Sequence, residues 1–160
     1  MTISAANNLD AMTGDLVNAY LNANTQKKIY TRAGTEFELV GIMDEGTLLE
    51  VIEAPYGLPT SGNRWHANLL HTLREMGFTL TRFDPDVLIR GREGGYNYIR
   101  THTDDVLVVA VNPTSIFDKL KETYTIKALG PPKVNIGCDY AQVKKGATTW
   151  WVMGISTYIK

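Results

Sequence analysis

Residues 96–111, YNYIRTHTDDVLVVAV, decide the fold of this chain. The segments 96–100 and 106–111 are rich in aromatic and β-branched residues, which favours two β-strands. The residues between them are polar, so the pattern predicts a β-hairpin with acids at its tip. Asp104 and Asp105 stand there, directly before an apolar run that is typical of a buried strand.

Acidic side chains beside a buried strand require a physical reason. Neighbouring carboxylates repel each other and raise each other's pKa, whereas Mg²⁺ binds a few carboxylates together with water and phosphate oxygens. Asp104 and Asp105 are therefore candidate metal ligands, and the alternative is an ordinary exposed turn. Asp15 is a third candidate, in a segment over 11–20 that is predicted to be a strand running into a short turn or helix, and the alternative for it is a helix N-cap. Spacing alone does not show whether the three acids meet.

Two helices are predicted outside this hairpin. In residues 61–76, apolar side chains recur at steps of three and four and form one apolar face. A second helix follows Asn112, which is a suitable N-cap, and Pro113, which suits a first helical turn. Further strands are expected over 28–32, 35–42, 47–52, 87–90, 123–127, 134–140 and 148–153, and the first ten residues are expected to be irregular.

Strands and helices that do not alternate regularly predict an α+β fold, an antiparallel sheet with helices packed on one face. The length of 160 residues and the absence of a linker predict a single domain over 1–160. The formal net charge of −1 argues against strong nucleic-acid binding by charge alone. No apolar run approaches the roughly 20 residues of a membrane span, so no membrane association is expected.

Six motifs in order resemble copia-type retrotransposon reverse transcriptases and together cover nearly the whole chain. They are DLVNAYLN (15–22, a first catalytic motif), YGLPTSGNRW (56–65), GF (77–78), DPD (84–86), HTDD (102–105, where the family has Tyr-Val-Asp-Asp) and YTIKALG (124–130), followed by a later Ile136-Gly137. The resemblance implies a fragment of the palm and fingers of an RNA-directed DNA polymerase.

The resemblance also implies a catalytic centre with two Mg²⁺ ions, for which Mn²⁺ is a possible substitute. Asp15 and Asp104 would be the main ligands, Asp105 a lesser one, and the backbone carbonyl of Leu16 a further oxygen ligand. The ions would activate a primer 3′-hydroxyl and hold the triphosphate of a deoxynucleotide.

Four further residues acquire roles from the resemblance. Tyr20 would lie beneath the sugar of the incoming nucleotide and exclude ribonucleotides, and Tyr56 and Gly57 would lie beside nucleotide and template. Lys127 would stand near the pyrophosphate leaving group as a candidate general acid. The alternatives are a core tyrosine for Tyr20, an ordinary turn glycine for Gly57 and an exposed lysine for Lys127.

The resemblance implies partners as well: an RNA or DNA template-primer, deoxynucleoside triphosphates, and the integrase and ribonuclease H of the same polyprotein, in cytoplasmic virus-like particles. The upstream fingers segment, the thumb and ribonuclease H are expected to be absent from this chain. Pro55, Pro59 and His102 depart from the family pattern. The alternatives to an active polymerase are a non-catalytic relic of a retrotransposon, folded but inactive or only nucleic-acid-binding, and an unrelated α+β interaction module.

Overall fold

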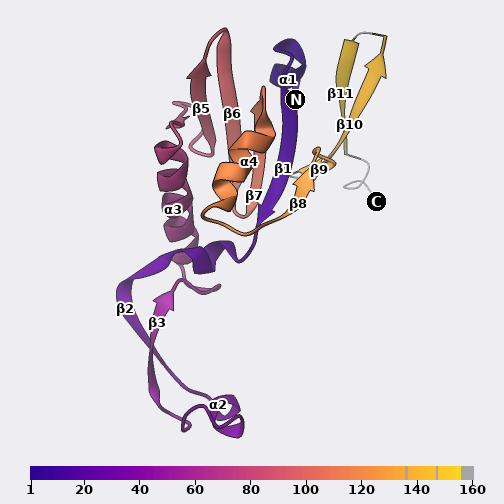
Figure 1. Cartoon of the computed structure of the whole chain (residues 1–160). Helices are drawn as coiled ribbons and strands as arrows, with labels where there is room; N and C mark the ends of the chain where they lie inside the picture. The colour runs from indigo at the N-terminus through magenta and orange to yellow at the C-terminus, as the bar shows by residue number, and fades with distance from the viewer. Residues whose placement is uncertain (136, 147, 156–160) are drawn as a thin grey trace. The chain divides into compact units, whose positions relative to one another are not determined.

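The computed structural model of the chain describes residues 1–135, 137–146 and 148–155 (Figure 1). It divides into two compact units, which are described separately. The sheet unit comprises Met1–Val17 and Thr72–Lys160, and the hairpin unit comprises Asn18–His71. The division falls within helix α3 (Ser61–Glu75).

The sheet unit is built mainly from β-strands. Besides the end of α3, it contains α1 (Thr2–Ala6), β1 (Asp10–Leu16), β4 (Thr79–Leu80), β5 (Val87–Arg92), β6 (Gly95–His102), β7 (Asp105–Ala110), α4 (Pro113–Lys121), β8 (Ile126–Gly130), β9 (Val134–Asn135), β10 (Cys138–Lys145) and β11 (Thr148–Gly154).

The described residues form one six-stranded antiparallel sheet in the order β4-β5-β6-β7-β1-β8. The predicted hairpin is confirmed as β6 and β7, which pair from Tyr98 opposite Val109 to His102 opposite Asp105. Strand β1 comes first in the chain, yet it lies between β7 and β8. The sheet therefore surrounds the segment that contains Asp15 with strands from the C-terminal half of the chain.

Helix α4 packs against β1 and β7. It begins as predicted, with the Asn112 side chain accepting a hydrogen bond from the Ser115 N–H at 3.1 Å and with Pro113 as its first residue. Its apolar face, including Ile116, Phe117 and Leu120, is buried. Together with the antiparallel sheets, this confirms the predicted α+β fold.

The opposite face of the six-stranded sheet also carries an apolar cluster. Leu9, Ala11 and Val109 are buried, and partly buried side chains, Met1, Tyr98, Leu107 and Trp151 among them, pack around them. Trp151 belongs to the smaller sheet β11-β10-β9, and its indole N–H donates to Ser4 Oγ of α1 at 3.2 Å. The prediction that the first ten residues are irregular was wrong, because Thr2–Ala6 form a helix that contacts β11.

The hairpin unit contains η1 (Ala19–Asn22), β2 (Asn24–Arg32), α2 (Thr35–Leu39) and β3 (Leu48–Glu53). Strands β2 and β3 pair antiparallel and lead to α2 at their far end (Figure 1). The strand predicted over 35–42 was wrong. Glu36 and Glu38 in the first turn stabilise a short helix through its dipole, and the strand that pairs with β2 is β3.

Helix α3 has the apolar face that the spacing predicted, with Trp65, Leu69 and Leu73 buried. Gly77, at φ 84°, ends it: the Gly77 N–H donates to Arg74 O and the Phe78 N–H to Leu73 O, as in a Schellman motif. The strand predicted over 134–140 is divided into β9 and β10, which pair with each other as a hairpin. Residue 136 of that segment lies outside the described residues.

Candidate active site

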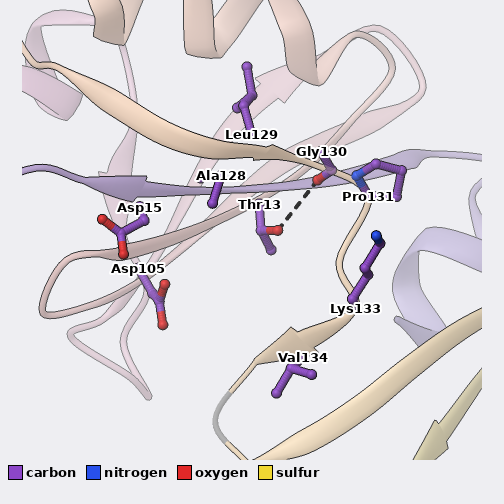
Figure 2. Close-up of a pocket in the computed structure, with 10 residues that line it drawn as sticks. Thr13, Asp15, Asp105, Ala128, Leu129, Gly130, Pro131, Lys133 and Val134 are labelled. Carbon is purple, nitrogen blue, oxygen red and sulfur yellow. Dashed lines mark hydrogen bonds between the residues drawn. The ribbon is translucent and has the colours of Figure 1, made fainter.

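The register of the central strands brings two of the three predicted acids together. Asp15 in β1 lies directly opposite Asp105 in β7. Side chains that are directly opposite in an antiparallel pair share a face, with Cβ atoms roughly 4.5–5.5 Å apart. Figure 2 shows the two carboxylates side by side at one end of a pocket.

Packing on the other side of β1 determines which face Asp15 occupies. Gly14 faces α4 so closely that an added Cβ would lie 2.9 Å from Phe117 Cε1 and 2.8 Å from Ile126 Cγ2. Because successive side chains of a strand alternate between faces, Asp15 points away from α4. A glycine under the helix thus places the strand close to α4 and the acid on the open face.

The third acid, Asp104, lies in the two-residue turn between β6 and β7. Its backbone carbonyl accepts a hydrogen bond from the Leu16 N–H at 2.7 Å, which ties the turn to the end of β1. Its partner in the turn, Thr103, has a φ of 54°, a left-handed conformation that is uncommon for a β-branched residue. Among the described residues, no three acidic, histidine or cysteine side chains are grouped closely enough to hold a metal ion. The structure thus pairs Asp15 with Asp105 rather than with Asp104.

The acid pair is electrostatically unfavourable in the absence of a cation. Burial raises the pKa of Asp105, and the charges of Asp104 and Asp15 raise it further, while His102 opposes them. Asp15 Oδ1 is buried and accepts no hydrogen bond. The Lys127 ammonium lies 3.3 Å from it as an ion-pair partner. Lys127 and Asp15 therefore form a close ion pair whose geometry is not that of a hydrogen bond.

This donor set fits a divalent cation. Mg²⁺ is held in proteins by one or two carboxylates and completes its coordination with water and substrate phosphates. Asp15 and Asp105 supply two carboxylates on one face, one of them with an oxygen that no hydrogen bond occupies. A cation would also remove the repulsion that raises the pKa of Asp105.

The pocket next to the acids has a volume of about 500 Å³. Besides the acid pair it is lined by Thr13, the segment 128–131, Lys133 and Val134 (Figure 2). Thr13 Oγ1 donates to Gly130 O at 3.4 Å. Sequence reasoning missed Thr13 and Lys133, which lie outside the motifs that carry the resemblance.

A β-bulge in β8 shapes the wall of this pocket. Strand β1 pairs Thr13 with Gly130 but Asp15 with Lys127, so the register shifts by one residue between them. Ala128 within the bulge has a φ of 51°. Glycine is the residue that usually adopts this conformation in such a bulge.

We expect Ala128→Gly to increase stability by up to about 1 kcal/mol. The left-handed conformation costs an L-residue roughly 1–2 kcal/mol, and glycine removes this cost. Part of the gain is offset because glycine loses more backbone entropy on folding than alanine does. The measurement is the free energy of unfolding in denaturant. Ala141→Gly, in an exposed part of β10 without a positive φ, is the matched control and should destabilise the chain. Destabilisation by both changes would contradict the strain at Ala128.

Asp105→Asn is expected to raise the melting temperature at pH 7 in metal-free buffer. The folded chain resists ionisation of Asp105, whereas the unfolded chain ionises it near 3.8. Stability is therefore lost as pH rises from about 3.8 through the higher folded-state pKa, and the asparagine variant lacks this loss.

The gain in melting temperature should shrink at pH 3, where the wild-type carboxyl is protonated in both states. Mg²⁺ should raise the melting temperature of the wild type more than that of Asp105→Asn, because a ligand that binds only the folded state stabilises it. Asp10→Asn, at an exposed position of β1, is the control and should respond to Mg²⁺ as the wild type does. An equal rise in melting temperature with Mg²⁺ for the wild type and Asp105→Asn would contradict the role of Asp105.

Three of the residues predicted to lie near the nucleotide, Tyr20, Tyr56 and Gly57, belong to the hairpin unit, whereas Lys127 belongs to the sheet unit. The rings of Tyr20 and Tyr56 contact each other, with centroids 4.6 Å apart and planes tilted by 52°. Gly57 has a φ of 93°, so the turn itself requires glycine. The neighbouring loop is anchored, because the Ala54 N–H donates to Ala23 O at 2.8 Å and Ser61 Oγ donates to Pro55 O at 2.6 Å. Pro55, which departs from the family pattern, thus lies in an ordered loop.

Comparison with known proteins identifies the family. A model for reverse transcriptase (RNA-dependent DNA polymerase) matches residues 1–158. The chain therefore belongs to the reverse transcriptase family, whose general activity is RNA-directed DNA polymerisation, a nucleotidyl transfer. No curated protein matches the chain significantly. None of the helices in the described part of the chain has the length and apolar character needed to cross a membrane.

Proposed function

We propose that this chain carries the catalytic centre of a copia-type retrotransposon reverse transcriptase. The reaction is the transfer of a deoxynucleotide from its triphosphate to a primer 3′-hydroxyl. The observation that carries the proposal is the direct pairing of Asp15 with Asp105 on the open face of a central strand, beside a pocket. The family supplies the reaction class.

Asp15 and Asp105, with Asp104 and the carbonyl of Leu16, are the residues proposed to hold two Mg²⁺ ions. When bound, such ions lower the pKa of the attacking hydroxyl and stabilise charge during in-line displacement. The buried Oδ1 of Asp15, which accepts no hydrogen bond, and the raised pKa of Asp105 support the assignment of these two residues. Asp104 and Leu16 are joined by a backbone hydrogen bond, so a shift of the turn alters both together.

Side chains of the protein perform the remaining steps. Lys127, more than half exposed, is proposed to donate a proton to the leaving pyrophosphate. Tyr20, supported by its contact with Tyr56, is proposed to exclude a 2′-hydroxyl from the incoming sugar. Gly57 permits close approach of the backbone to nucleotide and template.

The partners follow from the same proposal. They are a template-primer, deoxynucleoside triphosphates, and the integrase and ribonuclease H of the polyprotein, within cytoplasmic virus-like particles. The near-neutral charge of the chain makes these neighbours the expected source of basic contacts to phosphate.

The test is primer extension on an RNA template, with the chain expressed together with its upstream and downstream coding segments. We expect Mg²⁺-dependent incorporation of deoxynucleotides. Tyr20→Ala should keep part of this activity and admit ribonucleotides. Tyr30→Ala, at an exposed tyrosine of β2, is the control and should leave the selectivity unchanged. Failure of the unmutated protein to extend any primer would favour the non-catalytic relic.

A further inference from the structure

We propose that Lys127 is the internal counter-cation of Asp15: its ammonium neutralises the carboxylate while no divalent ion is bound and is released when an ion binds. Binding of the ion and release of the lysine are then one coupled event. The inference rests on the proposed function, because it takes Asp15 to be a metal ligand.

The β8 bulge places the lysine opposite the acid. If the register that pairs Thr13 with Gly130 continued without a shift, residue 128 would stand opposite Asp15. Lys127 would then be one position further along and would point to the other face of the sheet. The bulge inserts one residue and brings Lys127 opposite Asp15 instead. The strained backbone at Ala128 thus has a specific result, the presentation of a cation to the acid.

Asp15 lies between a like charge and an opposite charge. Asp105 stands opposite it on the β7 side, and Lys127 stands opposite it on the β8 side. The Nζ–Oδ1 distance of 3.3 Å makes the lysine a close partner of an oxygen that accepts no hydrogen bond. Lys127 therefore partly offsets the repulsion within the acid pair.

The pair is suited to exchange. The Lys127 side chain is 63% exposed, and that of Asp15 is 28% exposed. An ion pair in which one member reaches into solvent is weak, and a long lysine side chain can move away without disturbing the strand. A divalent cation brings twice the charge and also contacts Asp105, so it displaces the ammonium.

Coupling of this kind is reciprocal. If the lysine weakens ion binding by competing for Asp15, the ion must weaken the hold of Asp15 on the lysine by the same factor. The ammonium would be freed at the moment the site is loaded, and only then could it contact a substrate phosphate.

The first measurement is Mn²⁺ affinity of the complete 160-residue chain, followed through the electron paramagnetic resonance signal of free Mn²⁺. Loss of a surface ion pair corresponds to a change of roughly two- to fivefold in affinity. Lys127→Met should tighten Mn²⁺ binding by that factor. Lys133→Met removes a lysine that lines the pocket beside the acids but is not the ion-pair partner of Asp15, and it should have a smaller effect.

The second measurement is acetylation of individual lysines by a water-soluble reagent, quantified by mass spectrometry with and without Mg²⁺. Mg²⁺ should raise the yield at Lys127, and Lys133 should not show this rise. Thermal melts of each variant verify that it is folded.

The outcomes separate the two proposals. If Lys127→Met and Lys133→Met increase the Mn²⁺ affinity equally, the counter-cation inference alone is overturned. The same holds if the wild type binds Mn²⁺ and Lys127→Met leaves its affinity unchanged. Absence of Mn²⁺ binding in both the wild type and Lys127→Met overturns the metal site as well. Binding by Lys127→Met but not by the wild type supports strong competition by the lysine.

Discussion

Asp15→Asn is expected to lower primer extension by at least about a hundredfold in the chain with its flanking coding segments. The asparagine keeps the size of the side chain but removes the charge that faces Asp105 and Lys127. Metal ions supply several kcal/mol of transition-state stabilisation, and each 1.36 kcal/mol corresponds to a factor of ten in rate. The measurement is the single-turnover rate of extension at saturating Mg²⁺.

Asp10→Asn is the matched control, because Asp10 lies on the same strand but is exposed at its other end. It should extend primers at the wild-type rate. If Asp15→Asn also extends at that rate, another site performs the chemistry. A variant whose rate recovers at high Mn²⁺ concentration would instead support weakened ion binding at Asp15.

Phe117→Ala is expected to cost about 3–5 kcal/mol of stability, the usual range for a large aromatic residue removed from a core. Phe117 is fully buried, and its ring atom Cε1 lies 2.9 Å from the place that a Cβ on residue 14 would take. Gly14→Ala should cost about 1–3 kcal/mol by overpacking. Denaturant unfolding at equilibrium measures both changes.

The double variant tests the contact itself. In the Phe117→Ala background, Gly14→Ala should cost clearly less than in the wild type, since the ring that obstructs the added methyl group is gone. Relief is expected to be partial, because Ile126 Cγ2 stays 2.8 Å from the added atom. Strictly additive costs would show that α4 does not press on β1 at this point.

Local chemistry made part of the fold predictable. The β6–β7 hairpin follows from alternating strand residues around a polar tip, and α4 from its Asn112 cap and apolar spacing. Helix α2 was missed because Phe37 and Leu39 alternate as in a strand. A single short segment cannot show that β2 pairs instead with β3, which lies beyond α2 in the chain.

The motifs named Asp15, Asp104 and Asp105 as candidate ligands, with Asp105 as the lesser one. That Asp15 pairs with Asp105 was not predictable, because this pairing depends on the long-range register of β1 against β7. The contact between Lys127 and Asp15 depends on a one-residue bulge, which no local spacing encodes. Tyr20 and Tyr56 were both named from motifs, and their ring contact arises only when η1 and the loop after β3 fold together.

The position of β1 between β7 and β8 has a consequence for biosynthesis. The strand that carries Asp15 is translated before both of its neighbours, which lie in the last half of the chain. At roughly 5–20 residues per second, β1 waits for several seconds with both edges unpaired. Unpaired strand edges can pair with the wrong partner, so keeping this nascent segment away from other chains should improve the folded yield. The pair of Asp15 and Asp105 therefore cannot assemble before β7 has been translated.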